Sequence, residues 1–219
     1  MEVEVDSQGN ENAATAAARG EIYGLLANVF RAEPTSAFLS LIKGPFSETL
    51  NELGASLGGA FAETLEDALA EELAIEYTAL FLGPGGHLSP HESVNTESPD
   101  GKRASLWGER TAQVKSFIET AGLEYRSDFD GMPDHITAEL EFMQALMARQ
   151  AEALDAGDDD GAEYCRGIAQ RFLNEHLGAW VPDFCDRVIS KTQQPYFKEM
   201  AGVTKAFVEY ELSEAAGTA

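Results

Sequence analysis

Two short stretches of the chain carry the residue types that can do chemistry. The first is rich in proline and glycine and contains His87, His91 and Glu92. The second is the Pro-Asp-His segment 133–135, which precedes an expected helix and is followed by Glu139. Imidazole and carboxylate groups that lie together can transfer protons, attract a cation or ligate a metal ion. These residues are therefore candidates for catalysis, for binding and for a metal site.

An ordinary structural role is also open to each of these residues. Asp134 precedes an expected helix, where a carboxylate accepts hydrogen bonds from free backbone N–H groups. His135 and Glu139 lie at i and i+4 and can form a hydrogen-bonded pair on one helix face. Zinc motifs place their ligands on defined helical or turn spacings with a third ligand nearby, whereas His87 and His91 belong to a proline-containing loop. We expect no metal site, and the alternative to a binding protein is a metal-dependent hydrolase with the ligands His87, His91, Asp134 and His135.

An apolar helix face leads into the first stretch. Tyr77, Leu80 and Phe81 recur at helical spacing just before Gly83-Pro84, a pair that stops a helix. This spacing is typical of core residues, but a helix end beside an acidic loop can also present an apolar surface to a partner. Glu76 adds a further carboxylate at the same place.

The sequence motifs of common enzymes are missing. The chain contains no GxSxG nucleophile motif, no GxxxxGK[ST] phosphate loop, no GxGxxG and no HExxH. The Gly-Pro-Gly-Gly segment 83–86 predicts a turn and lacks the lysine of a phosphate-binding loop. We therefore expect neither catalytic activity nor a cofactor.

The charge balance excludes one large class of function. The chain has 38 Asp+Glu against 15 Lys+Arg, a net charge of −23, and the basic run Lys102-Arg103 is too short for a nucleic-acid site. An acidic surface of this kind either attracts a cationic partner or adapts a protein to high salt. We favour salt adaptation, because the acids are spread along the chain, and the two interpretations are compatible.

The sequence also predicts where the chain acts. No apolar stretch approaches the roughly 18–20 residues needed to span a bilayer. The acidic start, Met1–Asp6, is unlike a secretory signal, which begins basic and continues apolar. We expect a cytoplasmic protein without stable membrane insertion.

Helical periodicity runs through almost the whole chain. No segment shows the period-two alternation of strands, so we expect an all-α fold, a single domain of nine or ten helices over residues 15–212. One of these helices is expected to run from Phe61 to Phe81, and a long functional loop follows at 83–103. Residues 1–14 predict a disordered acidic tail and residues 213–219 a flexible one.

Four segments of the chain resemble one known family. They are EYTALFLGPGG followed by SPHESV at 76–94, WGERT at 107–111, MPDHITAELEFM at 132–143, and FLNEHLGAWVPDF at 172–184. In order and spacing they are similar to the TorD/DmsD family of maturation chaperones for molybdenum oxidoreductases. The resemblance covers about residues 16 to 212.

The resemblance implies a function. Members of this family are all-helical, non-catalytic chaperones of anaerobic respiration in the cytoplasm. They bind the twin-arginine leader of a molybdopterin-containing oxidoreductase subunit, and they hold that subunit until its cofactor is inserted and it is exported. The implied partners are this leader and the folded body of the catalytic subunit, with the chaperone as a monomer or homodimer. The client enzyme is not identifiable from one sequence.

The resemblance also implies a leader-binding surface. Its residues here are Tyr77, Leu80, Phe81, Pro90, His91, Asp134 and His135. A leader with a cationic head and an apolar stretch needs acidic groups beside an apolar groove, and Glu76, Glu92 and Glu139 complete the acidic set. Relatives often have an aromatic residue where this chain has His91. We expect the three segments to line one groove.

Overall fold

The computed structural model describes residues 2–84, 86–96, 106–122 and 129–217. These residues contain no β-strand, and their only extended pairing is one isolated bridge, so the all-α prediction is confirmed. They form eleven α-helical segments, one of which is the single turn α6 (Glu92–Asn95) inside the expected loop. None of the described helices combines the length and the apolar character needed to cross a bilayer.

The helices follow one another through short connections. The first part of the chain forms α1 (Glu2–Arg31), α2 (Ser36–Lys43), α3 (Ser47–Glu52), α4 (Gly58–Glu63), α5 (Glu66–Tyr77) and the π-helical segment η1 (Thr78–Leu82). After α6 come α7 (Glu109–Thr120), α8 (Ile136–Asp155), α9 (Asp159–Phe172), the π-helical segment η2 (Leu173–Leu177), α10 (Gly178–Lys191) and α11 (Pro195–Gly217).

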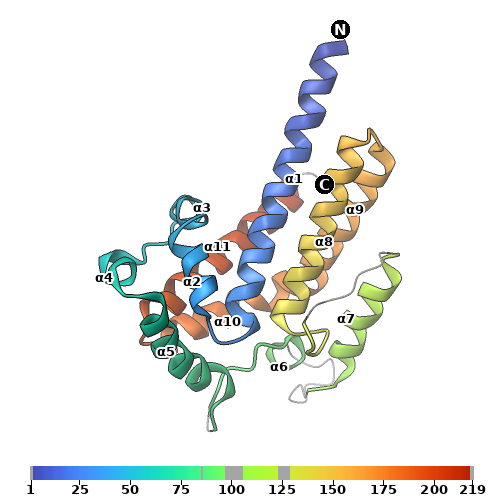
Figure 1. Cartoon of the computed structure of the whole chain (residues 1–219). Coiled ribbons are helices and arrows are strands. Elements are labelled where there is room, and N and C mark those ends of the chain that lie inside the picture. Colours follow the sequence, from blue (N-terminus) through green and yellow to red (C-terminus); the bar gives the residue numbers. More distant parts are fainter. Residues whose placement is uncertain (1, 85, 97–105, 123–128, 218–219) are drawn as a thin grey trace.

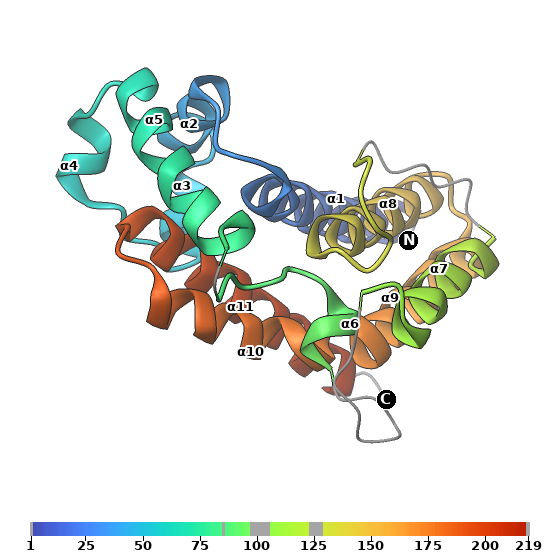
Figure 2. The same cartoon turned by 90° about the horizontal axis from the view of Figure 1, so that it is seen from below.

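The long helices form two layers. α1 packs along α8, with α9 on the other side of α8, while α10 and α11 pack on each other behind them (Figure 1). The short helices α2 to α5 cover one end of these layers and α7 lies at the other end (Figure 2). The single turn α6 lies between α7 and α10, which it contacts. This position places α6 where the two layers meet.

Periodicity explains the central position of α8. Ile136, Leu140, Met143 and Met147 recur at helical spacing, and each is at most 1% exposed. Their face packs against α1, which is the most extensive helix pair of the fold. The start of α8 is therefore held rigidly, together with the polar residues that precede it.

A charged contact fastens α1 to the last helix. The Arg19 guanidinium donates to the Glu211 carboxylate, with Nε 2.9 Å from Oε1. The buried Tyr23 hydroxyl donates to the same carboxylate at 2.9 Å. Glu211 is 1% exposed, so its charge is compensated by both donors rather than by water.

Aromatic side chains fill the core between α1, the α5–η1 helix and the C-terminal helices. Phe81 lies 5.0 Å from Tyr77, 6.1 Å from Phe197, and 6.2 Å from both Phe30 and Phe184, measured between ring centroids. The rings meet at tilted or edge-to-face angles, an arrangement that favours aromatic pairs. The cluster therefore packs the α5–η1 helix against α1, α10 and α11.

A π-helical turn shapes the segment that faces α6. A Cβ at Gly178 would lie 2.7 Å from the Leu173 carbonyl oxygen, so the wide turn of η2 needs a glycine here. Pro182 follows inside α10, where the missing N–H leaves the helix one hydrogen bond short. The irregular stretch carries His176 and Trp180, which point into the candidate site.

Two sequence predictions about helix ends differ from the structure. The single helix expected from Phe61 to Phe81 is interrupted at Thr64, whose backbone is extended, and Leu65 is 75% exposed rather than on the buried face. The expected tails 1–14 and 213–219 are partly helical, since α1 begins at Glu2 and α11 ends at Gly217. The alanine-rich stretch 13–18 favours helix and contains no residue that stops one. The limits of the domain, 15–212, stay a prediction.

Candidate functional site

The two stretches singled out by the sequence meet in the structure. The N–H of Glu92 donates to the Asp134 carbonyl at 2.8 Å, and the N–H of Ile136 donates to the Pro90 carbonyl at 2.9 Å. Together they form an antiparallel bridge between His91 and His135. His91 is the N-cap of α6 and His135 that of α8. The bridge therefore fixes the starts of both helices against each other.

The two histidines form a neutral pair at this bridge. Their ring centroids are 4.9 Å apart. His91 Nδ1 is 3.0 Å from the Ser89 hydroxyl, and His135 Nδ1 accepts the N–H of Thr137 at 3.1 Å. The pKa of His135 is lowered to about 3, mainly by burial and to a smaller extent by the nearby His91 ring and the Arg31 guanidinium. Burial also lowers the pKa of His91, so neither ring is charged near neutral pH.

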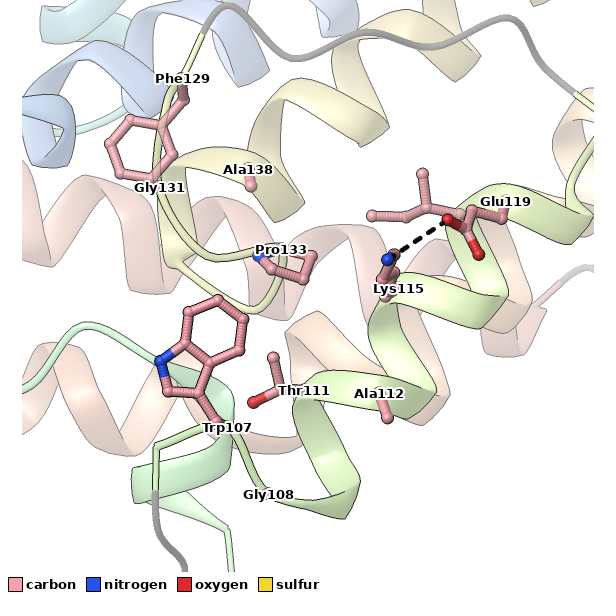
Figure 3. A pocket seen from close by; sticks show the side chains of 11 residues that line it. Trp107, Gly108, Thr111, Ala112, Lys115, Glu119, Phe129, Gly131, Pro133 and Ala138 are labelled. Carbon is pink, nitrogen blue, oxygen red and sulfur yellow. Dashed lines mark ion pairs between the residues drawn. The ribbon is translucent and has the colours of Figure 1, made fainter.

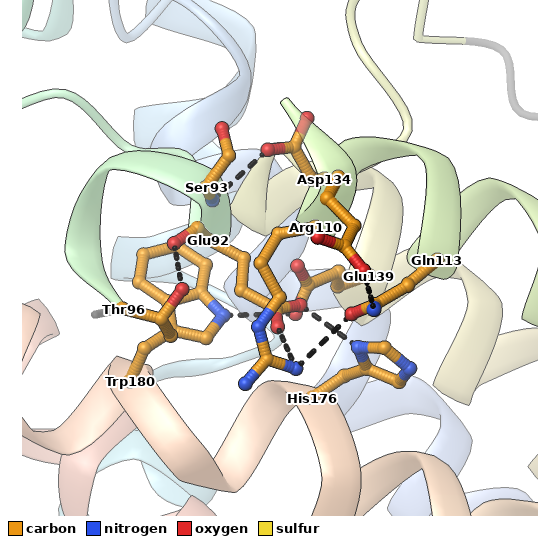
Figure 4. A network of polar contacts seen from close by, with 10 residues as sticks. Glu92, Ser93, Thr96, Arg110, Gln113, Asp134, Glu139, His176 and Trp180 are labelled. Carbon is orange, nitrogen blue, oxygen red and sulfur yellow. Dashed lines mark hydrogen bonds and ion pairs between the residues drawn. The ribbon is translucent and has the colours of Figure 1, made fainter. Parts of the chain in front are cut away.

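Glu92 lies at the centre of a buried polar network (Figure 4). Its side chain has no exposed surface. Oε2 is 3.0 Å from His176 Nδ1, and Oε1 is 3.5 Å from a guanidinium nitrogen of Arg110. Arg110 belongs to α7 and is about one-third exposed, with a side-chain exposure of 32%. The network therefore reaches solvent on the side of Arg110.

Glu139 is a second fully buried carboxyl of this network. Its Oε2 accepts the indole N–H of Trp180 at 3.1 Å, so the pair expected between Glu139 and His135 is replaced by a bond to α10. Burial raises the pKa of Glu139 well above its ordinary value, and the negative charges of Glu92 and Asp134 raise it further. The indole N–H opposes these effects only in part. The protonated form of Glu139 is therefore favoured more strongly here than in a free glutamate.

Asp134 caps a helix, but not the one expected. Its Oδ2 accepts the N–H of Ser93 at 3.1 Å and so satisfies a free donor at the start of α6. Its own helix, α8, is capped by the His135 ring instead. The carboxylate thus joins the two segments at the bridge, and its side chain is completely buried.

Several buried polar atoms around this network have no hydrogen-bond partner among the described residues. They are Asp134 Oδ1, Ser93 Oγ and Thr111 Oγ1, together with Glu92 Oε1 and Glu139 Oε1, which belong to two carboxyls that can pair with each other only through a shared proton. Buried polar atoms are nearly always hydrogen-bonded in folded proteins, because leaving one unpaired costs about 1–3 kcal/mol. A concentration of such atoms in one place marks a site rather than ordinary core.

The apolar half of the predicted groove lies elsewhere. Tyr77, Leu80 and Phe81 are at most 5% exposed and belong to the aromatic core. The Tyr77 hydroxyl donates to the Phe30 carbonyl at 3.0 Å, and burial raises the Tyr77 pKa to about 12. The expectation that these three side chains line a surface groove is wrong in this structure, because the helical spacing directs them inward.

Glu76 is also separate from the network. Its Oε1 accepts the Thr192 hydroxyl at 2.7 Å and the N–H of Gln193 at 2.8 Å. It therefore ties α5 to the connection between α10 and α11. Of the ten predicted site residues, the structure brings together Pro90, His91, Glu92, Asp134, His135 and Glu139.

The arrangement gives no support to the hydrolase alternative. His87 is exposed, while the carboxylate of Asp134 is bonded to Ser93. His91 and His135 both use their Nδ1 atoms in other contacts. Across the described part of the chain, no group of three or more His, Cys, Asp or Glu side chains is placed to hold a metal ion.

A cavity of about 580 Å³ opens beside the network (Figure 3). It lies between α7 and the segment that leads into α8, and most of its wall is apolar. Trp107 and Phe129 lie toward one side of it, and Lys115 and Glu119 toward the other. Trp107 is 77% exposed and has a φ of 65°, a conformation rare for a bulky residue.

Sequence reasoning assigned no role to four residues of this region. They are Trp107, Arg110, His176 and Trp180. All four lie in segments that carry the family resemblance, which was the available signal. Their contacts join positions far apart in the chain, so spacing could not reveal the partners.

Comparisons with known proteins agree with this resemblance. The model of the family described as nitrate reductase delta subunit matches residues 42–186. The chain is 27% identical to the chaperone protein TorD of Shewanella loihica over 213 residues, which covers 89% of this chain and 91% of that protein. It is 35% identical over 120 residues to the chlorate reductase assembly chaperone protein of Ideonella dechloratans. It is 33% identical over 118 residues to the selenate reductase assembly chaperone protein of Thauera selenatis. Each of the latter two matches covers 54% of this chain and 58% of the relative.

These matches define the class of protein. The chain belongs to the nitrate reductase delta subunit family, and within it to the TorD/DmsD-type maturation chaperones. The members named above are assembly chaperones and not catalysts, so the chain is not an enzyme.

Proposed function

We propose that this chain binds the twin-arginine leader of a molybdopterin-containing oxidoreductase subunit and holds that subunit in the cytoplasm until cofactor insertion and export. The relatives named as reductase assembly chaperones support the general role. The folded body of the same subunit is the second proposed partner, and the chaperone acts as a monomer or homodimer.

The carboxylate network is the observation that carries the leader-binding part of the proposal. Asp134 has a carboxylate oxygen without a hydrogen-bond partner among the described residues, and the only side-chain partner for the second oxygen of Glu92 besides Arg110 is another carboxyl, that of Glu139. Arg110 contacts Glu92 only at 3.5 Å, longer than the 2.7–2.9 Å of a good charge-assisted bond. A guanidinium group of a partner can therefore approach where Arg110 reaches solvent and donate hydrogen bonds to these carboxylate oxygens.

The charge of the whole chain supports the same partner. With a net charge of −23, the surface attracts cationic segments and repels acidic ones. The twin arginines suit this site better than twin lysines do, because a planar guanidinium can bond two carboxylate oxygens at once. Lysine offers a single compact charge.

The test is a binding titration with matched peptides. Fluorescently labelled leader peptides with either two arginines or two lysines are titrated with the wild-type chain and followed by anisotropy. We expect the arginine peptide to bind at least about tenfold more tightly. Equal affinities, or no binding of either peptide, would contradict the proposal.

Two variants locate the binding charge. Glu92→Gln keeps the shape of the side chain and a bond to His176 but removes the charge, so it should weaken binding of the arginine peptide. Arg110→Gln should tighten binding, because it removes the internal competitor for Glu92. Glu209→Gln is the matched control, since Glu209 is an exposed acid of α11 that pairs with Lys205 and belongs to neither the network nor the cavity wall.

A further inference from the structure

We propose that the cavity between α7 and the start of α8 binds an apolar side chain of the client leader, from the uncharged stretch that follows the two arginines. This inference rests on the proposed function and adds a second contact region to it. The cavity residues are not among those that the family resemblance implied for leader binding.

The cavity has the form of a binding pocket. Its volume of about 580 Å³ lies in the range of about 300–1,000 Å³ common for ligand sites. Ala112, Ile118, Pro133 and Ala138 contribute apolar surface to its wall. The volume accommodates a large aliphatic or aromatic side chain with part of the backbone that carries it.

Trp107 marks the opening of this pocket. Its indole lines the cavity while the residue remains 77% exposed. A φ of 65° is unfavourable for a side chain with a Cβ, and such conformations concentrate at functional sites. An exposed tryptophan beside an apolar cavity gains buried area when a partner covers it.

One polar group of the cavity wall, the Thr111 hydroxyl, lacks a hydrogen-bond partner among the described residues. Thr111 lines the cavity and is 4% exposed. The hydroxyl oxygen is itself buried, so it is an unpaired polar atom behind the cavity wall rather than an exposed contact point.

Residues of the cavity wall are sequence neighbours of the carboxylate network. Thr111, Pro133 and Ala138 of its wall directly follow or precede Arg110, Asp134 and Glu139 of the network in the sequence. A peptide whose guanidinium meets the network can therefore place a nearby apolar residue in the cavity.

Charge around the cavity selects the kind of peptide. The charged residues of 106–122 and 129–135 are Glu109, Glu119, Asp130 and Asp134 against Arg110 and Lys115. Arg110 and Lys115 are both engaged with acids, at 3.5 Å and 3.7 Å. An apolar segment attached to a cationic one is thus favoured over an acidic segment.

The test is a substitution that places a larger side chain in the cavity from an exposed position of α7. Ala112 is an exposed residue of α7 that lines the cavity, and Ala112→Phe occupies part of the volume. Ser116→Phe is the matched control, because Ser116 is exposed on the same helix but is not part of the wall. Two tryptophan-free synthetic peptides serve as probes. One has two arginines followed by a leucine-rich stretch, and the other ends after the arginines.

Affinities for the two peptides separate this inference from the proposed function. We expect the wild type and Ser116→Phe to bind the long peptide at least about tenfold more tightly than the short one. Ala112→Phe should bind both peptides with the affinity of the short one. Wild-type affinity of Ala112→Phe for the long peptide would overturn the inference and leave leader binding intact. Failure of the wild type to bind either peptide would overturn both.

Tryptophan quenching identifies what covers the cavity. Trp180 is 1% exposed, so acrylamide should quench Trp107 selectively in the free protein. The long peptide should protect Trp107, and the short peptide should not. Protection of Trp107 before any peptide is added would show that the chain itself or a second copy occupies the pocket, and would overturn the inference. Sedimentation of Trp107→Ala would then distinguish these two occupants.

Discussion

The aromatic cluster around Phe81 and the carboxylate network around Glu92 are both buried, but they differ in how complete their contacts are. Phe81 has four ring neighbours within 6.2 Å, one from each of α1, α5, α10 and α11. Glu92 has one oxygen bonded to His176 and another that meets Arg110 only at 3.5 Å. Beside the aromatic cluster a single buried polar atom lacks a partner, the Tyr196 hydroxyl, whereas several such atoms lie together around Glu92. Burial alone therefore does not separate core from site, and a concentration of unsatisfied polar atoms does.

The two regions should respond differently to mutation. Phe81→Ala removes a large side chain that is 4% exposed, and we expect the free energy of unfolding to fall by about 3–5 kcal/mol. Leu82→Ala is the control, because Leu82 is the next residue and is 64% exposed. Urea denaturation followed by circular dichroism measures both. Near-wild-type stability of Phe81→Ala with lost leader binding would place Phe81 on a binding surface and remove the contrast.

The sequence predicted the aromatic region only in part. The spacing of Tyr77 and Phe81 correctly indicated a buried helix face. The resemblance placed the same residues on a leader-binding surface, and burial contradicts that expectation. Side chains at helical spacing share one face of the helix, so they cannot lie both in the core and on a surface. For deciding which of the two holds, the apolar periodicity was a more direct signal than the resemblance.

The network was less accessible to sequence reasoning. Pro90, His91, Asp134 and His135 were expected to come together, and the bridge confirms this. The sequence could not show that Glu92 is completely buried, because its partner His176 lies 84 residues later. Acidic residues are mostly exposed, so burial of a glutamate becomes visible only when its partners are placed around it.

The histidine pair provides the next largest expected effect. Since the pKa of His135 falls to about 3 on folding, the unfolded chain binds this proton first as the pH drops below about 6.5. The free energy of unfolding is unaffected above that pH and should decrease below it, by up to about 1.4 kcal/mol per pH unit.

His135→Asn isolates this contribution. Asparagine also caps a helix but does not titrate, so its curve of unfolding free energy against pH should be flatter between about pH 6.5 and 4. Phe81→Ala should lose stability equally at every pH in this range, because it changes no titrating group. A slope for His135→Asn as steep as that of the wild type would show that His135 titrates normally in the folded protein.

Glu139→Gln should change stability in the opposite direction. Because the folded pKa of Glu139 is raised, the unfolded chain releases this proton more readily as the pH rises above about 4.5. Protonated Glu139 stabilises the fold at low pH, and that stabilisation is lost as the pH rises towards the folded pKa.

Glutamine imitates the protonated carboxyl and can still accept the Trp180 N–H. At pH 7 the variant should therefore be more stable than the wild type, because the neutral amide avoids the cost of a buried charge. Thermal melting at several pH values checks this expectation. A less stable Glu139→Gln at pH 7 would mean that the carboxylate is ionised and that its charge holds the network together.

Salt should produce the smallest change, and it should act outside both buried regions. The net charge of −23 makes the folded surface repel itself, and the Debye length shortens from about 10 Å at 0.1 M to about 3 Å at 1 M salt. The melting temperature should therefore rise by a few degrees in potassium chloride, which is equivalent to less than about 1–2 kcal/mol. Buried charges are screened much less, so the melting temperature of Glu139→Gln should depend on salt in the same way as that of the wild type.

Leader binding should weaken over the same range of salt concentration, since screening reduces the attraction of the leader to the acidic network. A melting temperature that stays constant or falls would contradict salt adaptation, and a salt slope altered by Glu139→Gln would place the responsive charges in the network.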